Sequence, residues 1–460
     1  MCIIEYRRES AMSNCTSIFI ITKRRVRMKK ITAFFLALVL GLTLVSFASC
    51  GSDDEVELVF AWWGGDFRAE QTHQVIELFL AQTDNVVYIE PIINGFGDHW
   101  TALDIRAAAN DLPDIMQHDV AHLLRYVEAG HLVDLTPFMN DGRIDVRNIP
   151  QTTIDQGRIP GRPGVYALPI GLNVVAMIYN KSLLDELGLE ARRNMTMNEF
   201  IDLAREIYAR SGVRTNWGVH VTHDPFIQME IHLRAQGINL FEGTSLGGTW
   251  ENYVEYFEVI QLGLQEGWHI TAEDMMGRDG AAMNAMWYPP GAENAHMRVW
   301  NSPVWSNMIN GYIADSPPDM EISMTTHPSS NPQRSSFGRA SMYLAITTHS
   351  DHQDEAAEFI SFWLNSVPAH EIMLGERGFI VNTAVASAVY DQLPLGGQKQ
   401  SEFVAWTNAG NSAPFNPLRP DGAGEALSIL RTIVEEFMHG LLTPEEAAQR
   451  FFTEGNAVLR

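Results

Sequence analysis

From residue 56 onward, short apolar runs alternate with amphipathic stretches. Residues 56–61 alternate into an apolar run that predicts a β-strand. Residues 67–81 carry apolar side chains at helical spacing, and the apolar residues 86–93 predict a second strand. Strand, helix and strand in this order form a βαβ unit, so the sequence predicts an α/β fold with a parallel sheet.

The same alternation continues to the end of the chain. Short apolar runs predict strands at 113–116 and 174–179. Thr196 and Glu199 have the spacing of a capping box and predict the start of a helix. Other helices are predicted at 122–129, 180–188, 253–264, 355–364 and from 443 to the C-terminus. No internal repeat or low-complexity tract interrupts this pattern.

Residues 28–50 have the layout of an export signal. Lys29 and Lys30 precede an apolar stretch from Ile31 to Phe47, and small residues then lead to Cys50. The pattern resembles the lipobox of bacterial lipoproteins, in which the cysteine becomes the first mature residue and carries lipid. Such boxes usually have leucine where this chain has Phe47.

This resemblance divides the N-terminal region into three parts. Residues 1–27 are predicted as an upstream extension outside the native protein, with Met28 as the start; residues 28–50 as a lipoprotein signal peptide; and residues 51–55 as a flexible tether. The alternative is an uncleaved transmembrane anchor, although about 17 apolar residues are at the bottom of the range that spans a bilayer.

Composition agrees with export. The three cysteines are Cys2, Cys15 and Cys50, so beyond Cys50 no thiol remains for a disulfide or a nucleophile. Eight of the 32 basic and two of the 56 acidic residues lie in residues 1–50, which leaves a net charge of -30 on the remainder. Such a charge repels nucleic acid and anionic lipid, so neither is an expected partner.

Several short segments together carry a family resemblance. They are the first strand with Trp62 and Trp63 at its end, Leu112–Met116, Gly130–Leu135, Tyr166–Pro169, Ile178–Lys181, Asp279–Trp287, Leu344–Thr347 and Glu355–Phe362. In order and spacing they resemble the extracellular solute-binding proteins of bacterial ABC importers, in the group that mostly carries sugars. The chain departs from the family at Ala281, where a Lys or Arg usually follows the glycine.

The resemblance implies a two-lobed periplasmic-binding-protein-like fold of the α/β class. Each lobe would be discontinuous in sequence, and ligand would lie in a central cleft between them. Carried onto this chain, residues 56–166 plus 323–375 form the first lobe, and residues 167–322 plus 376–460 form the second. The hinge crossings would lie near Tyr166 to Asn173 and near Gly375 to Phe379.

The residues can be tested against the chemistry of a sugar. A sugar has an apolar face that stacks on aromatic rings, and a rim of hydroxyls that bonds carboxylates, amides and guanidinium groups. Ligands of open α/β sheets lie at the carboxyl ends of strands. The candidate ligand-binding residues are Trp62, Trp63, Asp66, Asp119, Asn173, Trp287, Tyr288, Arg339 and Trp406.

Each candidate has a structural alternative. Trp62 and Trp63 are consecutive, so on a strand they face opposite ways and one can be core. Trp287 stands at the family position of a stacking aromatic, with packing in the interior as the less favoured alternative. Asp114 could also touch a ligand, but it follows a proline at a strand start, where an aspartate is as often a local cap. Arg339 can bond a hydroxyl pair or pair with a surface carboxylate.

Catalytic patterns are scarce. Residues 243–247 have nucleophile-elbow spacing but no preceding apolar strand, so they are interpreted as a turn. His118, His122 and His131 are close in sequence, but a further ligand at fitting spacing is missing, so no metal site is predicted. With no P-loop and no dinucleotide fingerprint, no cofactor is expected and the protein is interpreted as a non-enzyme.

The sequence therefore predicts a monomeric, lipid-anchored receptor on the extracytoplasmic face of the cell membrane. It would capture a carbohydrate, with an oligosaccharide favoured by the number of tryptophans, and deliver it to an ABC permease driven by a separate ATPase. Two alternatives remain open, namely an exported glycoside hydrolase and a receptor for a polyamine or other cationic solute.

Overall fold

The computed structural model describes residues 55–218, 226–275, 299–314, 316–411 and 419–459. The predicted signal peptide, Cys50 and the segment that holds Trp287 and Tyr288 lie outside these residues. Among the residues that are described, no helix combines the length and apolar character needed to cross a bilayer.

The chain enters the fold through the predicted βαβ unit. Strand β1 (Val56–Trp63) leads to helix α2 (Asp66–Leu80), and strand β2 (Val86–Asn94) returns parallel to β1. Strand β3 (Ile115–His118) pairs parallel with the other edge of β1. The predicted parallel pairing is confirmed for these three strands.

The sheet continues with antiparallel strands from distant parts of the chain. Its order is β2-β1-β3-β9-β4-β7, and β8 also pairs with β4. These strands are β4 (Leu168–Asn180), β7 (Asn301–Trp305), β8 (Ile322–Thr325) and β9 (Gly338–Ile346). Because β9 is antiparallel to β3, it begins at the edge of the sheet where β3 ends.

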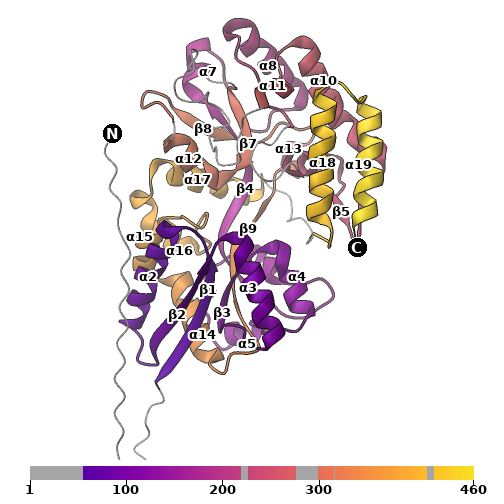
Figure 1. The fold of residues 1–460 in the computed structure, drawn as a ribbon. Coiled ribbons are helices and arrows are strands. Elements are labelled where there is room, and N and C mark those ends of the chain that lie inside the picture. The colour runs from indigo at the N-terminus through magenta and orange to yellow at the C-terminus, as the bar shows by residue number, and fades with distance from the viewer. Residues whose placement is uncertain (1–54, 219–225, 276–298, 315, 412–418, 460) are drawn as a thin grey trace, which may run out of the picture. The chain divides into compact units, whose positions relative to one another are not determined.

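Strand β4 connects the two lobes. Its residues 168–174 pair with β9, whereas residues 175–180 pair with β7 and β8. All 13 of its residues are buried. In Figure 1 it runs from the part of the fold that holds β1 to β3 toward the part that holds β7 and β8. Apolar side chains before Asn173 join the first-lobe core, and those after it join the second-lobe core, except Val175, which packs in a separate cluster with Trp305.

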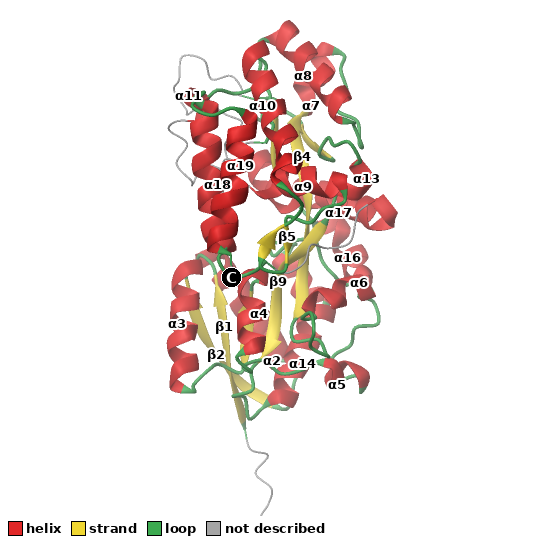
Figure 2. Ribbon diagram, turned by 90° about the vertical axis from the view of Figure 1, so that its right-hand side faces the viewer, coloured by secondary structure: helices red, strands yellow, loops and turns green. Residues whose placement is uncertain are grey.

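Helices cover both lobes, as Figure 2 shows. Besides α2, the first lobe has the helices α3 (Phe96–Ala109), α4 (Val120–Glu128), α5 (Thr136–Asn140), α6 (Gln151–Ile154), α14 (Gln353–Asn365), α15 (Val367–Met373) and α16 (Thr383–Val389). The others are α7 (Lys181–Leu187), α8 (Met197–Ser211), α9 (Phe226–Gln236), α10 (Val254–Glu266), α11 (Ala272–Met275), α12 (Ile309–Ala314), α13 (Pro332–Ser335), α17 (Leu395–Trp406), α18 (Ala423–Met438) and α19 (Pro444–Val458). Helices α18 and α19 pack side by side against α10.

Local signals in the sequence are confirmed at several element ends. The Thr196 hydroxyl accepts from Glu199 N–H, and the Glu199 carboxylate accepts in return from Thr196 N–H, as the capping box predicts. Residues 243–244 join two short antiparallel strands, β5 (Phe241–Glu242) and β6 (Ser245–Leu246). The elbow-like segment is therefore a hairpin turn, as interpreted from the sequence.

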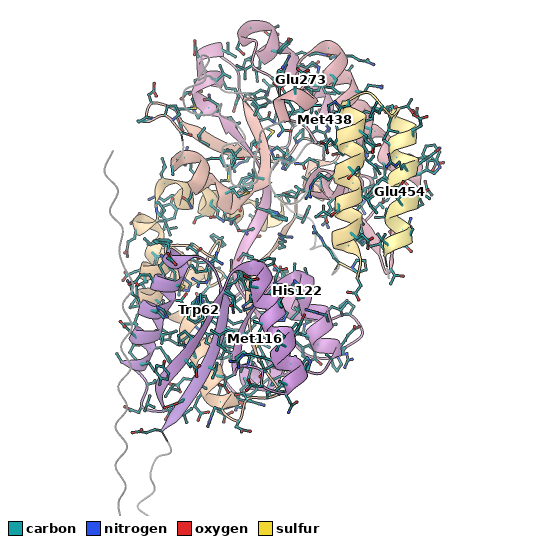
Figure 3. All side chains as sticks on the ribbon, in the orientation of Figure 1. Trp62, Met116, His122, Glu273, Met438 and Glu454 are labelled. Carbon is teal, nitrogen blue, oxygen red and sulfur yellow. The ribbon has the colours of Figure 1, made fainter. Side chains whose placement is uncertain are left out.

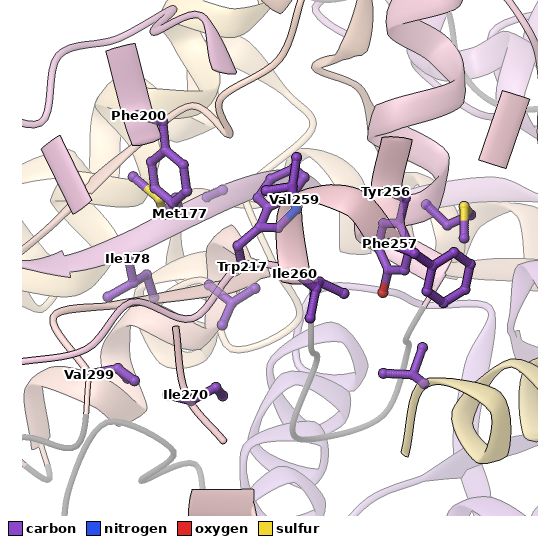
Figure 4. Packing of buried hydrophobic residues seen from close by; sticks show 14 of the residues in the cluster. Met177, Ile178, Phe200, Trp217, Tyr256, Phe257, Val259, Ile260, Ile270 and Val299 are labelled. Carbon is purple, nitrogen blue, oxygen red and sulfur yellow. The ribbon is translucent and has the colours of Figure 1, made fainter. Parts of the chain in front are cut away.

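Each lobe has its own hydrophobic core. Figure 4 shows part of the second, in which Trp217 and Phe200 pack with Met177 of β4. The first packs Trp363 of α14 against β1, where its ring meets Phe60 edge to face at 6.0 Å. Trp363, interpreted as core from its helical spacing, is only 1% exposed. Removal of such side chains from water is the main favourable term in folding.

The segment after α15 is fastened to the first lobe. Arg377 is 3% exposed, donates to Gln117 Oε1 and Thr72 Oγ1, and lies 5.0 Å over the Trp363 ring. Burial lowers the pKa of this guanidinium to about 9. Its neighbour Glu376 accepts a forked pair from Arg68 of α2. Hydrogen bonds to two elements, α2 and β3, hold this segment in place.

This attachment bears on the lobe boundaries, which stay a prediction. Phe379 exchanges backbone hydrogen bonds with Leu172 of β4, Val381 lies in the first-lobe core, and Thr383 N–H donates to the Asn148 carbonyl. By contrast, Phe403 of α17 packs in the second-lobe core. The packing favours a return of the chain to the second lobe close to Leu393, about twenty residues further along the sequence than the Gly375 boundary taken from the resemblance.

Asp114, directly before β3, links β1 to the segment after β9 through hydrogen bonds to its carboxylate. Its carboxylate accepts from Val59 N–H of β1 at 2.7 Å and from Ser350 Oγ at 2.5 Å. We expect Asp114→Ala to lower the free energy of unfolding by about 1–3 kcal/mol, because Val59 N–H is left without its partner. Urea unfolding measures this change. The exposed Asp111→Ala is the control, and equal stability of the two variants would contradict this role.

Candidate ligand-binding site

One edge of the sheet collects several polar and aromatic side chains. The parallel strands β1, β2 and β3 end there, and the antiparallel β9 begins there. Ligands of open α/β sheets bind outside the carboxyl ends of the strands. The residues at this edge therefore form the candidate site.

Asn173 and Arg339, which are 166 residues apart in sequence, are direct partners in the register of β4 and β9. Partners in an antiparallel pair project their side chains on the same face of the sheet. Two of the predicted residues are thus brought together. Tyr343 lies four residues after Arg339 on β9, but the register with β4 shifts between them, and Tyr343 packs with Ala340 in the cluster that holds Trp63 and Met116.

Asp119 joins this group from the end of β3. Its Oδ1 caps α4 by accepting from Ala121 N–H at 2.8 Å, which leaves the second carboxylate oxygen for other contacts. Burial raises the pKa of Tyr343; the Asp119 charge raises it further and the Arg339 charge lowers it. Both charges therefore act on one buried phenol.

Trp305 completes the group and was missed from the sequence. It ends β7, and the Arg339 guanidinium lies 4.2 Å over its ring. The Trp305 Nε1 and the Asn173 Oδ1 are buried, and neither has a hydrogen-bond partner among the described residues. An unpaired buried donor or acceptor costs about 1–3 kcal/mol, which a ligand hydroxyl can offset. The available signal was a tryptophan at the end of a short strand.

Trp62 and Trp63 face opposite sides of β1, as their spacing predicts. Trp62 is fully buried with Phe60 in one cluster, whereas Trp63 is 6% exposed in another cluster with Trp100. Figure 3 places Trp62 with Met116 inside the first lobe. Both indoles pack in the interior in this structure, and their contact with ligand stays a prediction.

Two more of the predicted residues, Asp66 and Trp406, lie apart from this group. Asp66 is exposed at the start of α2, after β1, whereas Asp119 follows the neighbouring strand β3. Trp406 ends α17, where it stacks on Phe403 and under Arg193, whose Cζ is 4.7 Å from the ring centre. Trp287 and Tyr288 lie outside the described residues. For all four, ligand contact is still a prediction.

An aromatic and histidine cluster borders Asp119. The ring of His122 stacks on Trp100 with 3.8 Å between centroids and an angle of 15°. His99 and His118 are fully buried beside Trp100. Figure 3 labels His122, which stands on α4 just beyond the end of β3.

Burial keeps the histidines of this cluster neutral. It lowers the pKa of His99 to about 4 and that of His118 to about 3. Burial also lowers the pKa of His122, with the Asp119 carboxylate opposing and the Arg125 guanidinium assisting. Within the described ranges, no group of three or more His, Cys, Asp or Glu side chains could hold a metal ion.

Comparison with known proteins decides the family. Residues 69–367, well over half of the chain, match the model of the bacterial extracellular solute-binding proteins. The chain belongs to this family. An arabinooligosaccharide-binding protein of Halalkalibacterium halodurans is 24% identical over 298 residues, which cover 62% of this chain and 64% of the relative. The match therefore spans less than two thirds of the relative's length.

Solved structures of solute-binding proteins share the fold. One is an extracellular solute-binding protein of family 1 from Alicyclobacillus acidocaldarius, with a TM-score of 0.72 and 20% identity, over 88% of this chain and 98% of that one. Another is an ABC substrate-binding protein from Listeria monocytogenes in complex with cycloalternan, with a TM-score of 0.67 and 18% identity, over 88% and 99%. The predicted two-lobed α/β fold is confirmed.

The buried histidines predict a loss of stability in acid. The unfolded chain takes up protons near pH 6.5, whereas folded His118 and His99 do not until about pH 3 and 4. Unfolding then binds extra protons, so the free energy of unfolding falls as the pH drops from about 6.5 toward 4. We expect His118→Gln to reduce this slope by up to about 1.4 kcal/mol per pH unit.

Urea unfolding at pH 7, 6 and 5 measures the slope in both proteins. Nuclear magnetic resonance of the wild-type imidazoles gives a second reading that needs no variant. Titration of the folded His118 ring between pH 7 and 5, or an unchanged slope in the variant, would contradict the assignment.

Proposed function

We propose that this solute-binding protein is the receptor of an ABC importer and that its ligand is a neutral oligosaccharide. The observation that carries this proposal is the convergence of Asp119, Asn173, Arg339 and Trp305 at one edge of the sheet, in a chain of this family. A carboxylate, an amide, a guanidinium and an indole are the groups that a sugar requires.

The relatives support a carbohydrate as the solute. One carries the name of an arabinooligosaccharide-binding protein, and one solved structure holds cycloalternan. The formal net charge of -24 works against anionic sugars, because long-range repulsion slows their approach. A neutral glycan meets no such barrier.

The receptor would work by closing its lobes on the ligand. Asp119 belongs to the first lobe, Trp305 to the second, and Asn173 and Arg339 lie on the strands that connect the lobes. A ligand that bonds all of them favours the arrangement in which they lie close together. Hinge bending near Asn173 on β4 and near Arg339 on β9 would bring the lobes together.

The setting of the receptor is also part of the proposal. Lipid on Cys50 would hold a monomer to the extracytoplasmic face of the membrane, where it delivers its ligand to a permease powered by a separate ATPase. Metabolic labelling with a palmitate analogue tests the anchor. We expect the label on the wild-type protein and its loss in Cys50→Ser, and equal labelling of both would contradict the anchor.

Thermal unfolding with a panel of ligands tests the function. The body from Ser52 onward is heated with arabino-oligosaccharides, malto-oligosaccharides, their monosaccharides and polyamines, and each glycan is then examined for cleavage. A ligand at 100 times its Kd stabilises the fold by about 2.7 kcal/mol, which raises the Tm measurably. Stabilisation by an intact oligosaccharide is the expected result. Cleavage would favour a hydrolase, and a shift with polyamines alone would favour a cation receptor.

Arg339 supplies the sharpest variant of this test. Loss of a charge-assisted hydrogen bond costs about 1.5–3 kcal/mol, so Arg339→Ala should weaken binding of the stabilising glycan by about 10- to 100-fold. The exposed Arg431→Ala on α18 removes the same charge elsewhere and should leave the Kd unchanged. Titration calorimetry measures both, and equal affinities would place the ligand away from Arg339.

A further inference from the structure

Phe96 is an exposed aromatic residue at the same edge of the sheet. It opens α3 directly after β2 and is 50% exposed, although a large apolar side chain gains free energy from burial. A single exposed aromatic is ordinary on a protein surface. Its surroundings distinguish this one.

Three aromatic or imidazole rings pack against the Phe96 ring on its protein-facing side. Its centroid lies 5.4 Å from Trp63, 6.2 Å from Trp100 and 6.5 Å from His122, in each case close to edge on. Edge-to-face pairs of this kind are worth about 0.5–1.5 kcal/mol beyond the area that they bury. The Phe96 ring is therefore fixed in place while half of its surface faces outward.

The cluster continues to Asp119. His122 stacks on Trp100 and is partly exposed, and its Nδ1 accepts from Arg125 at 3.3 Å. Because arginine only donates, this contact requires the uncharged Nδ1 of a neutral ring. The Asp119 carboxylate acts on the His122 ring as well as on Tyr343. Phe96 and His122 thus extend the edge that holds Asp119 and Arg339.

The separation along this edge can be read from the sheet order. Phe96 follows β2 and Arg339 lies on β9, with β1 and β3 between them. Three strand spacings of about 4.8 Å separate β2 from β9 by about 14 Å across the sheet, and Arg339 lies a further four residues along β9 from Tyr343, the partner of His118. A single sugar ring is too small to span this distance, whereas a chain of several linked rings can contact both.

We infer that Phe96, backed by Trp63 and Trp100 and flanked by His122, is a second stacking surface for the sugar chain. This inference rests on the proposed function and narrows its substrate class to glycans of at least three units. The monosaccharide or disaccharide at the Arg339 end would not contact Phe96.

Binding of a length series tests the inference. Titration calorimetry compares wild type, Phe96→Ala and Phe96→Tyr with arabino- and malto-oligosaccharides from one to six units. We expect Phe96→Ala to weaken binding of the longer members of the bound series about tenfold and that of the monosaccharide and disaccharide less than twofold. Phe96→Tyr should restore the longer members, because it retains the flat face.

Ile105→Ala is the matched control. Ile105 is 66% exposed on the same helix but nine residues further along it, and its replacement should change no affinity. Equal binding of long glycans by wild type and Phe96→Ala would overturn the inference and leave the proposed function standing, as would equal weakening of short and long glycans. Absence of saccharide binding by the wild-type protein would overturn both.

Discussion

The pairing of β4 with two sets of partners is the constraint on which the rest of the structure depends. The first half of this strand pairs with β9 and the second half with β7 and β8, and all of its residues are buried. A strand buried on both faces has to be apolar along its length, and Leu168–Asn180 meets this condition except at Asn173 and at its last residue, Asn180. The Asn173 amide oxygen is buried and has no hydrogen-bond partner in the part of the chain that the structure describes, at the point where the strand leaves one lobe for the other.

The residues that surround this point are also poised for recognition. Gly378 approaches Asn173 so closely that an added Cβ would lie 3.0 Å from its Oδ1. Arg339 lies beside Asn173 in register and rests on Trp305. A ligand held here would touch the connecting strands themselves. Its contacts then act at the hinge itself, so binding of the ligand favours one arrangement of the lobes over the other.

Much of the fold could be predicted because its signals are local. The alternation in 56–61, the apolar run 174–179 and the capping box at Thr196 each lie within a few residues of sequence, and each is confirmed. Helix α3 was missed, since Gly95 and Gly97 at its start are typical of a loop. The opposite orientations of Trp62 and Trp63 followed from the period of a strand.

The site was harder to predict because its residues come together only through the pairing register of strands that are distant in sequence. Asn173 and Arg339 were named for their chemistry, but only the pairing of β4 with β9 brings them together. Trp305 and Phe96 gain their roles from neighbours that are far away in sequence, such as Arg339 and Trp63. Composition supplies aromatic rings and carboxylates in excess, and does not indicate which of them meet.

The central claim is that the protein closes on an oligosaccharide, and a distance measured across the lobes tests it most directly. The chain beyond Cys50 has no cysteine, so spin labels can be attached to Thr101→Cys on α3 and Ser428→Cys on α18. Both sites are exposed. Electron-electron resonance then gives the separation with and without a glycan that stabilises the fold. The account predicts a shorter and narrower distance distribution when the glycan is bound. An unchanged distribution at saturating glycan would contradict it.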